Sequence, residues 1–168
     1  MPFHPEELHQ HVKELERLYA VIPGLDTNAK TALAKAIISA TASFVEGCLD
    51  SMSSQTLRQL GIPQVWTDDI VLGLKGLYDK ITFVKKRLAH LRSGWQVKDN
   101  ALSKFIEDRL GENRPGLLKL RNLIDHGNVV AQADLRLNNI TYFRLAACTY
   151  LEQVYTSLGI GKPGWLGK

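Results

Sequence analysis

Residues 67–91, TDDIVLGLKGLYDKITFVKKRLAHL, form the most regular apolar pattern in the sequence. Apolar side chains recur there at every third or fourth position: Ile70, Leu74, Leu77, Ile81, Val84, Leu88 and Leu91. This spacing places them on one face of an α-helix, so the pattern predicts a single long amphipathic helix. Thr67 is expected to cap its start, and Ser93-Gly94 to end it.

A second long helix is predicted upstream, from Asp26 or Thr27 to about Met52. Its apolar stripe comprises Leu33, Ile37, Ala40, Phe44, Cys48 and Met52. A loop that contains Gly61 and Pro63 is expected to connect the two long helices. Their apolar faces are expected to meet, which predicts an antiparallel pair of long helices.

Shorter apolar periodicities predict further helices over residues 5–21, about 99–110 with Asp99 as cap, about 115–126 and about 138–158. No strand pattern competes with them, and no low-complexity linker divides the chain. The predicted fold is an all-α bundle of five to six helices with two long antiparallel helices, in a single domain over residues 1–158. Residues 159–168 contain four glycines and a proline and are expected to form a flexible tail.

The composition is that of an ordinary globular protein, with 45% hydrophobic and 23% charged residues among 168. Cys48 and Cys148 each lie within an apolar helical pattern, so we expect small buried side chains rather than a disulfide framework. The first residues lack the basic and apolar regions of a signal peptide. We also expect no apolar run of the roughly 20 residues that span a bilayer. These features predict a cytoplasmic protein without membrane contact.

Cations outnumber acids on the predicted helix over residues 67–91, and the formal net charge of the chain is +4. A surface of one sign favours phosphate binding over pairing within the helix, so part of this set is a candidate RNA-binding surface. The candidates are Lys85, Lys86, Arg87 and Arg92. The alternative is that these side chains form only the solvated face of the helix.

Three histidines lie near the N-terminus: His4, His9 and His11. Their spacing matches no metal site, and histidines at a polar terminus are expected to be solvated. No carboxylate pair or Cys/His cluster elsewhere indicates a metal. The sequence therefore predicts neither a metal nor a cofactor.

Residues 118–127, LKLRNLIDHG, bring an arginine, an amide and a histidine to the end of an apolar helix. Gly127 is expected to end this helix as the left-handed residue past its last turn. Arg121 and His126 would be rotated by about 140° from each other in a continuous helix. They can converge only if the helix ends between them or at the histidine.

These side chains suit phosphate chemistry. The Arg121 guanidinium can hold two phosphate oxygens while charge develops in a transition state. The helix dipole and Asp125 favour the protonated imidazole of His126, which can then donate as well as accept a proton near neutral pH. Asn122 can orient the phosphate or the histidine. Together they predict metal-independent cleavage of RNA by 2′-hydroxyl attack, which leaves a 2′,3′-cyclic phosphate.

Arg-Asn-x-x-x-His followed by glycine, late in an all-helical chain of this size, resembles the signature of the HEPN domain family. That signature is an arginine, commonly a polar residue after it, and a histidine four to six residues further on. Arg121, Asn122 and His126 match it with the four-residue gap. The resemblance extends to the helix order over most of the chain, but only the motif is specific.

The resemblance implies a metal-independent endoribonuclease that acts as a homodimer, with the two motifs flanking one cleft. It also implies a toxin–antitoxin or antiphage defence context, in which an antitoxin or another defence protein is a partner. An acidic residue in the second long helix often accompanies the motif in such domains, and Glu46 is the candidate here.

Three other interpretations remain open. The chain could be a non-catalytic helical module that binds RNA or a partner protein through its basic surface. It could also be a nucleotide-binding bundle, which would enclose a pocket within one subunit. Finally, Arg121 and His126 could serve structure alone, the arginine stem packing over the bundle and the histidine capping carbonyl groups.

Overall fold

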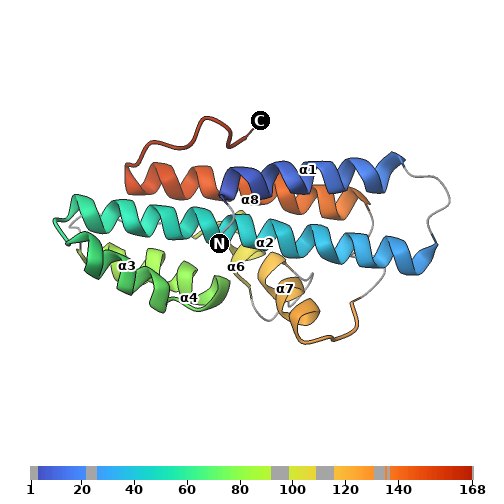
Figure 1. Ribbon diagram of the computed structural model, residues 1–168, viewed down its shortest axis with the longest axis horizontal. Coiled ribbons are helices and arrows are strands. Elements are labelled where there is room, and N and C mark those ends of the chain that lie inside the picture. Colours follow the sequence, from blue (N-terminus) through green and yellow to red (C-terminus); the bar gives the residue numbers. More distant parts are fainter. Residues whose placement is uncertain are drawn as a thin grey trace.

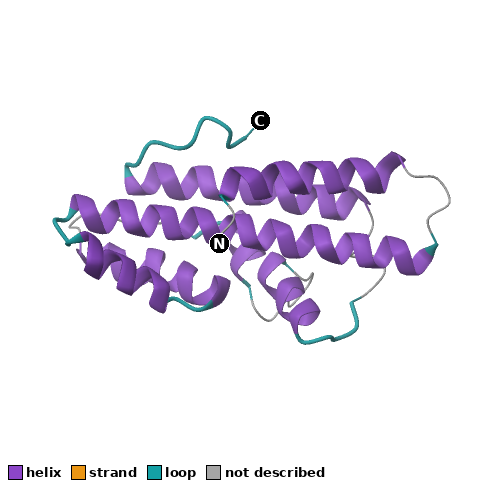
Figure 2. Ribbon diagram, viewed as in Figure 1, coloured by secondary structure: helices purple, strands orange, loops and turns teal. Residues whose placement is uncertain are grey.

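The computed structural model describes residues 4–21, 26–91, 99–108, 116–130, 135 and 137–167. Within these ranges the chain forms helices joined by loops and contains no strand (Figure 2). The predicted all-α class is confirmed.

The long helix α2, Thr27–Gln59, is the element against which most of the others pack (Figure 1). Helix α1, Pro5–Val21, has the predicted bounds and runs back along α2 in the opposite direction. The predicted cap of α2 is also confirmed, because the Asp26 carboxylate accepts a hydrogen bond of 2.7 Å from the Ala29 amide. Such a bond satisfies one of the free amides of the first turn.

The predicted end of α2 at about Met52 is wrong, since the helix continues to Gln59. Ser53, Thr56 and Leu57 are buried, so the segment keeps a core-facing side although its apolar pattern weakens. The predicted loop over residues 53–64 shrinks to residues 60–63. Packing rather than periodicity therefore holds the last two turns of α2.

The prediction of a single helix over residues 67–91 is also wrong, because the helix is interrupted there. The observed elements are α3 (Gln64–Gly73), α4 (Gly76–Thr82), the π-helical segment η1 (Phe83–Arg87) and α5 (Leu88–Leu91). Gly76, the first residue of α4, has a φ of 75°, a left-handed conformation that glycine adopts without strain and that does not occur inside a regular helix. The predicted stop at Ser93-Gly94 lies outside the described residues.

The start of this region also differs from the prediction. Pro63 precedes α3, which begins at Gln64, and the supposed cap Thr67 lies buried inside the helix. The Thr67 hydroxyl donates to the Ile62 carbonyl oxygen at 3.4 Å. Proline favours the beginning of a helix because its fixed φ suits the first turn.

The remaining helices are α6 (Ala101–Glu107), α7 (Leu117–Asp125) and α8 (Leu137–Leu158). Asn100 rather than the predicted Asp99 caps α6. The Asn100 side chain accepts from the Ser103 amide at 2.9 Å, and the Asn100 amide donates to the Ser103 hydroxyl at 2.8 Å. This reciprocal arrangement is a capping box.

The core lies where α1 and α8 pack on α2, with α3, α4 and α7 placed against other parts of α2 (Figure 1). Its largest fully buried side chains include Phe44, Ile37 and Leu49 of α2 and Tyr150 and Phe143 of α8. Cys48 and Cys148 are both buried and free, as predicted. An ion pair of 2.9 Å between Arg144 and Glu16 joins α8 to α1 in a largely buried position.

The segment after α8 is packed, which differs from the predicted flexible tail. Ile160 and Leu166 are buried, and the Trp165 ring lies 5.3 Å from the ring of His9 on α1. Figure 1 shows the segment turning back from the end of α8 towards α1. Three apolar side chains among the glycines and the proline supply the contacts that the composition did not suggest.

In the part of the chain that the structure describes, α2 is long and apolar enough to cross a membrane by length and composition. The expectation that no stretch would reach that length is therefore wrong. Of its most apolar window, 56% is buried inside the molecule, as in the core helix of a globular protein.

Candidate functional site

The end of α7 has the helix termination predicted from the sequence. Helix α7 ends at Asp125, His126 is its C-cap, and Gly127 has a left-handed φ of 66°. The Gly127 amide donates to the Ile124 carbonyl at 3.1 Å, and the Asn128 amide donates to the Leu123 carbonyl at 2.9 Å. These two bonds define a Schellman motif, which satisfies carbonyl groups of the last turn.

Replacing Gly127 with alanine is expected to destabilise the protein by about 1 kcal/mol, because only glycine adopts the left-handed conformation at no cost. An alanine Cβ at this position would have no atom within 4 Å, so the cost comes from the backbone and not from a clash. Urea denaturation monitored by circular dichroism measures it. Gly161→Ala is the matched control, since Gly161 has equally open surroundings and no positive φ. Equal unfolding midpoints for the two variants would contradict the conclusion that the left-handed conformation of Gly127 makes alanine unfavourable there.

Arg121 ties α7 to α2. Its Nε donates to Asp125 Oδ2 at 2.6 Å, one turn further along α7. Its Nη1 donates to the Ser39 carbonyl at 2.9 Å and to the Ser43 hydroxyl at 3.3 Å. Three groups on two helices therefore orient the guanidinium. The side chain is still 22% exposed, so part of it remains accessible to a ligand.

Asn122 and His126 are one helical turn apart, a spacing that places their side chains as neighbours on the helix surface. Asn122 is half-buried and His126 is exposed. Their backbones are joined as well, since the His126 amide donates to the Asn122 carbonyl at 3.1 Å. An amide and an imidazole therefore lie together at the accessible end of α7.

No hydrogen bond joins Arg121 to His126 in the described part of the chain, where the partners of the guanidinium are Asp125, Ser39 and Ser43. The arginine turns towards α2, whereas the histidine lies exposed beyond the last turn of α7. Asp125 does not pair with His126 but with Arg121, so part of its negative charge is already compensated. A ligand that touches both groups must therefore span the end of the helix, or must take them from two copies of the chain.

Glu46 lies on a line of polar residues along one side of α2, which we call the polar stripe: Ser39, Ser43, Glu46 and Asp50. Burial raises the pKa of Glu46, and the charges of Arg121 and Lys80 oppose that rise. The carboxyl group is thus within electrostatic reach of the Arg121 guanidinium. Asp50, one turn on, pairs with Lys80 of α4 at 2.5 Å.

Ser39, Ser43 and Asp50 are not among the site residues predicted from the sequence. Spacings of four, three and four residues put all members of the polar stripe on one face of α2, and this period could have indicated them. No local feature of the sequence indicates that this face would meet α7 and α4.

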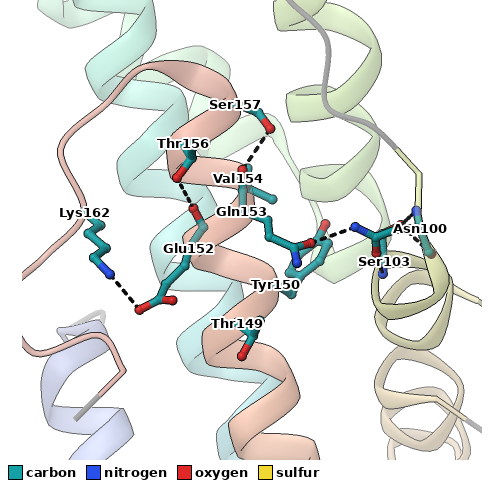
Figure 3. A pocket seen from close by; sticks show the side chains of 10 residues that line it. All are labelled: Asn100, Ser103, Thr149, Tyr150, Glu152, Gln153, Val154, Thr156, Ser157 and Lys162. Carbon is teal, nitrogen blue, oxygen red and sulfur yellow. Dashed lines mark hydrogen bonds and ion pairs between the residues drawn. The ribbon is translucent and has the colours of Figure 1, made fainter.

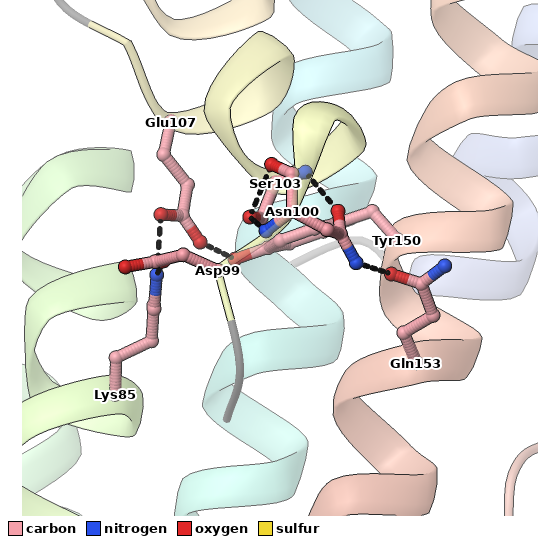
Figure 4. Close-up of polar contacts among 7 residues, drawn as sticks. All are labelled: Lys85, Asp99, Asn100, Ser103, Glu107, Tyr150 and Gln153. Carbon is pink, nitrogen blue, oxygen red and sulfur yellow. Dashed lines mark hydrogen bonds and ion pairs between the residues drawn. The ribbon is translucent and has the colours of Figure 1, made fainter. Parts of the chain in front are cut away.

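The four candidate RNA-binding residues differ in their accessibility to solvent. Lys85 is turned inward from η1 and pairs with Asp99 and with Glu107, the latter at 2.7 Å (Figure 4). Tyr150 donates to the same Glu107 carboxylate at 2.8 Å. Lys86 and Arg87 are exposed, while Arg92 lies outside the described residues. The charge of Lys85 is therefore largely neutralised within the fold, and the accessible cations of the described set are Lys86 and Arg87.

His4 and His11 are exposed as expected, but His9 is fully buried. Its ring lies edge-on to Phe44 at 5.4 Å, and its Nε2 is 3.5 Å from the sulfur of Cys148. Burial, assisted by the charges of Arg144 and Lys13, lowers the pKa of His9 from 6.5 to about 4. In the part of the chain that the structure describes, no group of three His, Cys, Asp or Glu side chains is arranged to hold a metal.

The buried His9 is expected to make stability depend on pH between 6.5 and about 4. In that range the unfolded chain binds a proton at His9 that the folded chain excludes, so the free energy of unfolding falls as the pH decreases. The total loss from this group is about 3 kcal/mol. Urea denaturation across the range measures it.

The variant His9→Phe isolates this effect, because it keeps an aromatic ring and removes the titration. We expect a shallower decline of its unfolding free energy over the same range. Identical slopes for the two proteins would show that His9 is protonated equally in both states.

A cavity of about 500 Å³ opens between the start of α6 and the second half of α8 (Figure 3). Asn100 and Gln153 lie across it and share a hydrogen bond of 2.9 Å. No residue of the Arg-Asn-x-x-x-His motif and no candidate RNA contact lines this cavity. It is therefore separate from the candidate site at the end of α7.

No family model, curated protein or solved structure matches this chain. The fold and the site themselves define an all-α protein in which a glycine-terminated helix carries an arginine, an amide and a histidine beside a half-buried carboxyl group.

Proposed function

We propose that this chain is a metal-independent endoribonuclease of the HEPN type, which cleaves RNA by attack of a ribose 2′-hydroxyl on the adjacent phosphate. The observation that supports the proposal is the end of α7, where the exposed His126 lies beside Asn122 while Asp125 and α2 orient Arg121. Acid–base catalysis at neutral pH suits an accessible imidazole, and a pre-oriented guanidinium suits developing phosphate charge.

In the proposed reaction His126 takes the proton from the 2′-hydroxyl as its oxygen attacks phosphorus. The bond from phosphorus to the 5′-oxygen breaks, and the leaving oxygen takes a proton from the protonated His126 of a second copy, which acts as the general acid. The products are a 2′,3′-cyclic phosphate and a free 5′-hydroxyl. Arg121 holds non-bridging phosphate oxygens through this step, and Asn122 positions the phosphate or the imidazole.

The proposal includes a homodimer. Within one chain Arg121 is held by Asp125 and by α2 while His126 is exposed, and a second copy would bring a second arginine and a second histidine to one substrate. Two histidines across a shared cleft can then act as base and acid in one turnover. The predicted pair of long antiparallel helices consists of residues 27–52 and 67–91, and only the first of these is one continuous helix, α2, since the second is divided into α3, α4, η1 and α5.

The cellular role that goes with this activity is a toxin or an antiphage defence component in the cytoplasm, controlled by an antitoxin or another partner protein. The exposed cations Lys86 and Arg87 would contribute to RNA affinity in either case. They also favour the second candidate function, a non-catalytic RNA-binding module. Salt-sensitive binding of RNA without turnover would identify that function.

The decisive experiment is to incubate the purified protein with single-stranded RNA in excess EDTA and to identify the new ends by mass spectrometry. We expect 2′,3′-cyclic phosphate and 5′-hydroxyl ends. An RNA whose riboses carry 2′-methoxy groups is the matched control and should remain intact, because it lacks the nucleophile. Absence of cleavage, or ends with a 5′-phosphate, would refute the proposed reaction.

A further inference from the structure

Helix α3 exposes apolar side chains that no other part of the described chain covers. Of its ten residues only Thr67 is buried. The exposed fractions are 69% for Val65, 63% for Trp66, 38% for Ile70 and 72% for Leu72. We call these four residues the α3 surface.

This exposure is unusual for a helix of this length. A ten-residue helix is marginal in water on its own, and such helices are normally held by burying an apolar face. Here most of the large apolar side chains point away from the bundle, and Leu60, at the preceding end of α2, extends the exposed set. Contiguous exposed apolar area of this kind is typical of a binding surface.

The charges on α3 itself are negative, while a cation lies at its C-terminal end, where Lys75 Nζ donates to the Leu72 carbonyl oxygen at 3.2 Å. Helix α3 itself carries two exposed aspartates, Asp68 and Asp69, and no cation. Asp69 is within one helical turn of Val65, Trp66 and Leu72, so a carboxylate lies amid the apolar side chains. Arg58, Lys75 and Asp79 are the exposed charged residues that flank the helix in sequence.

These charges favour some binding partners of the α3 surface over others. RNA and anionic lipid would both be repelled by the two aspartates, although the chain as a whole has a formal charge of +4. A symmetric contact with a second copy would bring the aspartates of both copies together. A segment that presents apolar residues flanked by lysines or arginines would bury the α3 surface and pair with both carboxylates.

We propose that the α3 surface docks a basic amphipathic helix of a partner protein. Leucine-like side chains of the partner cover Trp66 and Leu72, and its cations pair with Asp68 and Asp69. This interaction goes beyond the nuclease function, because α3 lies apart from α7 along α2 (Figure 1). Loss of this interaction is expected to leave the structure at the end of α7 unchanged.

The experiment uses a fluorescein-labelled synthetic peptide of about five helical turns, with leucines on one face and lysines elsewhere. We expect fluorescence anisotropy to show binding to the full chain with a Kd of roughly 10 μM. The variant Trp66→Ser/Leu72→Ser should weaken binding at least about tenfold, since both apolar contacts are lost. Asp68→Asn/Asp69→Asn should weaken it and reduce its dependence on salt.

Two matched controls make the result specific. A peptide with glutamates in place of the lysines should not bind, because it meets the aspartates with like charge. The variant Leu145→Ser removes an apolar side chain of α8 that is 51% exposed and should leave binding unchanged. Circular dichroism verifies that every variant is folded.

Several outcomes would overturn the proposal. These are no binding of the lysine peptide, equal binding of the glutamate peptide, or an equal loss of binding in Leu145→Ser. Sedimentation that shows self-association abolished by Leu72→Glu would identify a second copy as the occupant instead. Binding of anionic vesicles that is lost in Trp66→Ser/Leu72→Ser would identify a membrane.

Discussion

Replacing His126 with alanine is expected to lower the rate of RNA cleavage by about a hundredfold or more, because the reaction loses its general acid–base group. The folded structure should not change. His126 is exposed, and its backbone rather than its side chain makes the hydrogen bond that ends α7. Cleavage rates at saturating RNA and unfolding midpoints in urea measure the two effects separately.

The matched control is His11→Ala, which removes an exposed histidine from α1. A surface substitution of this kind is expected to change stability by no more than about 0.5 kcal/mol and to leave cleavage unchanged. If the protein and its His126→Ala variant cleave RNA at the same rate, His126 is not the acid–base group. If His126→Ala loses cleavage because the protein unfolds, the side chain of His126 is needed for folding, which would contradict a purely catalytic role.

Replacing Gly116 with alanine is expected to produce the largest loss of stability, about 3 kcal/mol or more. Gly116 is the N-cap of α7, and a Cβ there would lie 1.7 Å from the Phe105 carbonyl oxygen and 2.8 Å from its carbonyl carbon. Both are backbone atoms of α6, so no side-chain rotation relieves the clash. The φ of −84° suits alanine, and the whole effect therefore comes from separating α6 and α7. Urea denaturation gives the difference in unfolding free energy.

Gly73→Ala serves as the control for this substitution. Gly73 is the last residue of α3, has no positive φ, and has no atom within 4 Å of a Cβ placed on it. We expect it to be neutral or slightly stabilising, since alanine restricts the unfolded chain more than glycine does. Equal unfolding midpoints for Gly116→Ala and the unmodified protein would show that α6 and α7 separate at no cost.

The most accurate sequence predictions concern features that depend on residues close together in the chain. The bounds of α1, the Asp26 cap of α2 and the left-handed Gly127 after α7 are confirmed. A cap or a C-terminal glycine acts within one helical turn, so neighbouring residues suffice to predict it. The break between α3 and α4 was also open to prediction, because Gly73 and Gly76 each weaken a helix by about 1 kcal/mol.

The least accurate predictions concern where side chains point. Lys85 had the pattern of a solvated cation, but it is held between Asp99 and Glu107. His9 had the pattern of a solvated histidine, but Phe44 and Trp165 enclose it. Each outcome depends on residues far away in the sequence.

The amino-acid sequence alone is enough for the all-α class, the helix that ends just before Gly127 and the order of Arg121, Asn122 and His126 in that segment. Periodicity and capping energies act between residues within a turn of each other, so these features need no knowledge of the rest of the molecule. The orientation of Arg121 towards Ser39, 82 residues earlier, the polar stripe of α2 and the exposure of α3 required the folded arrangement. They depend on which helix faces pack against each other. This packing reduces the exposed apolar surface of the whole chain, and no single segment determines it.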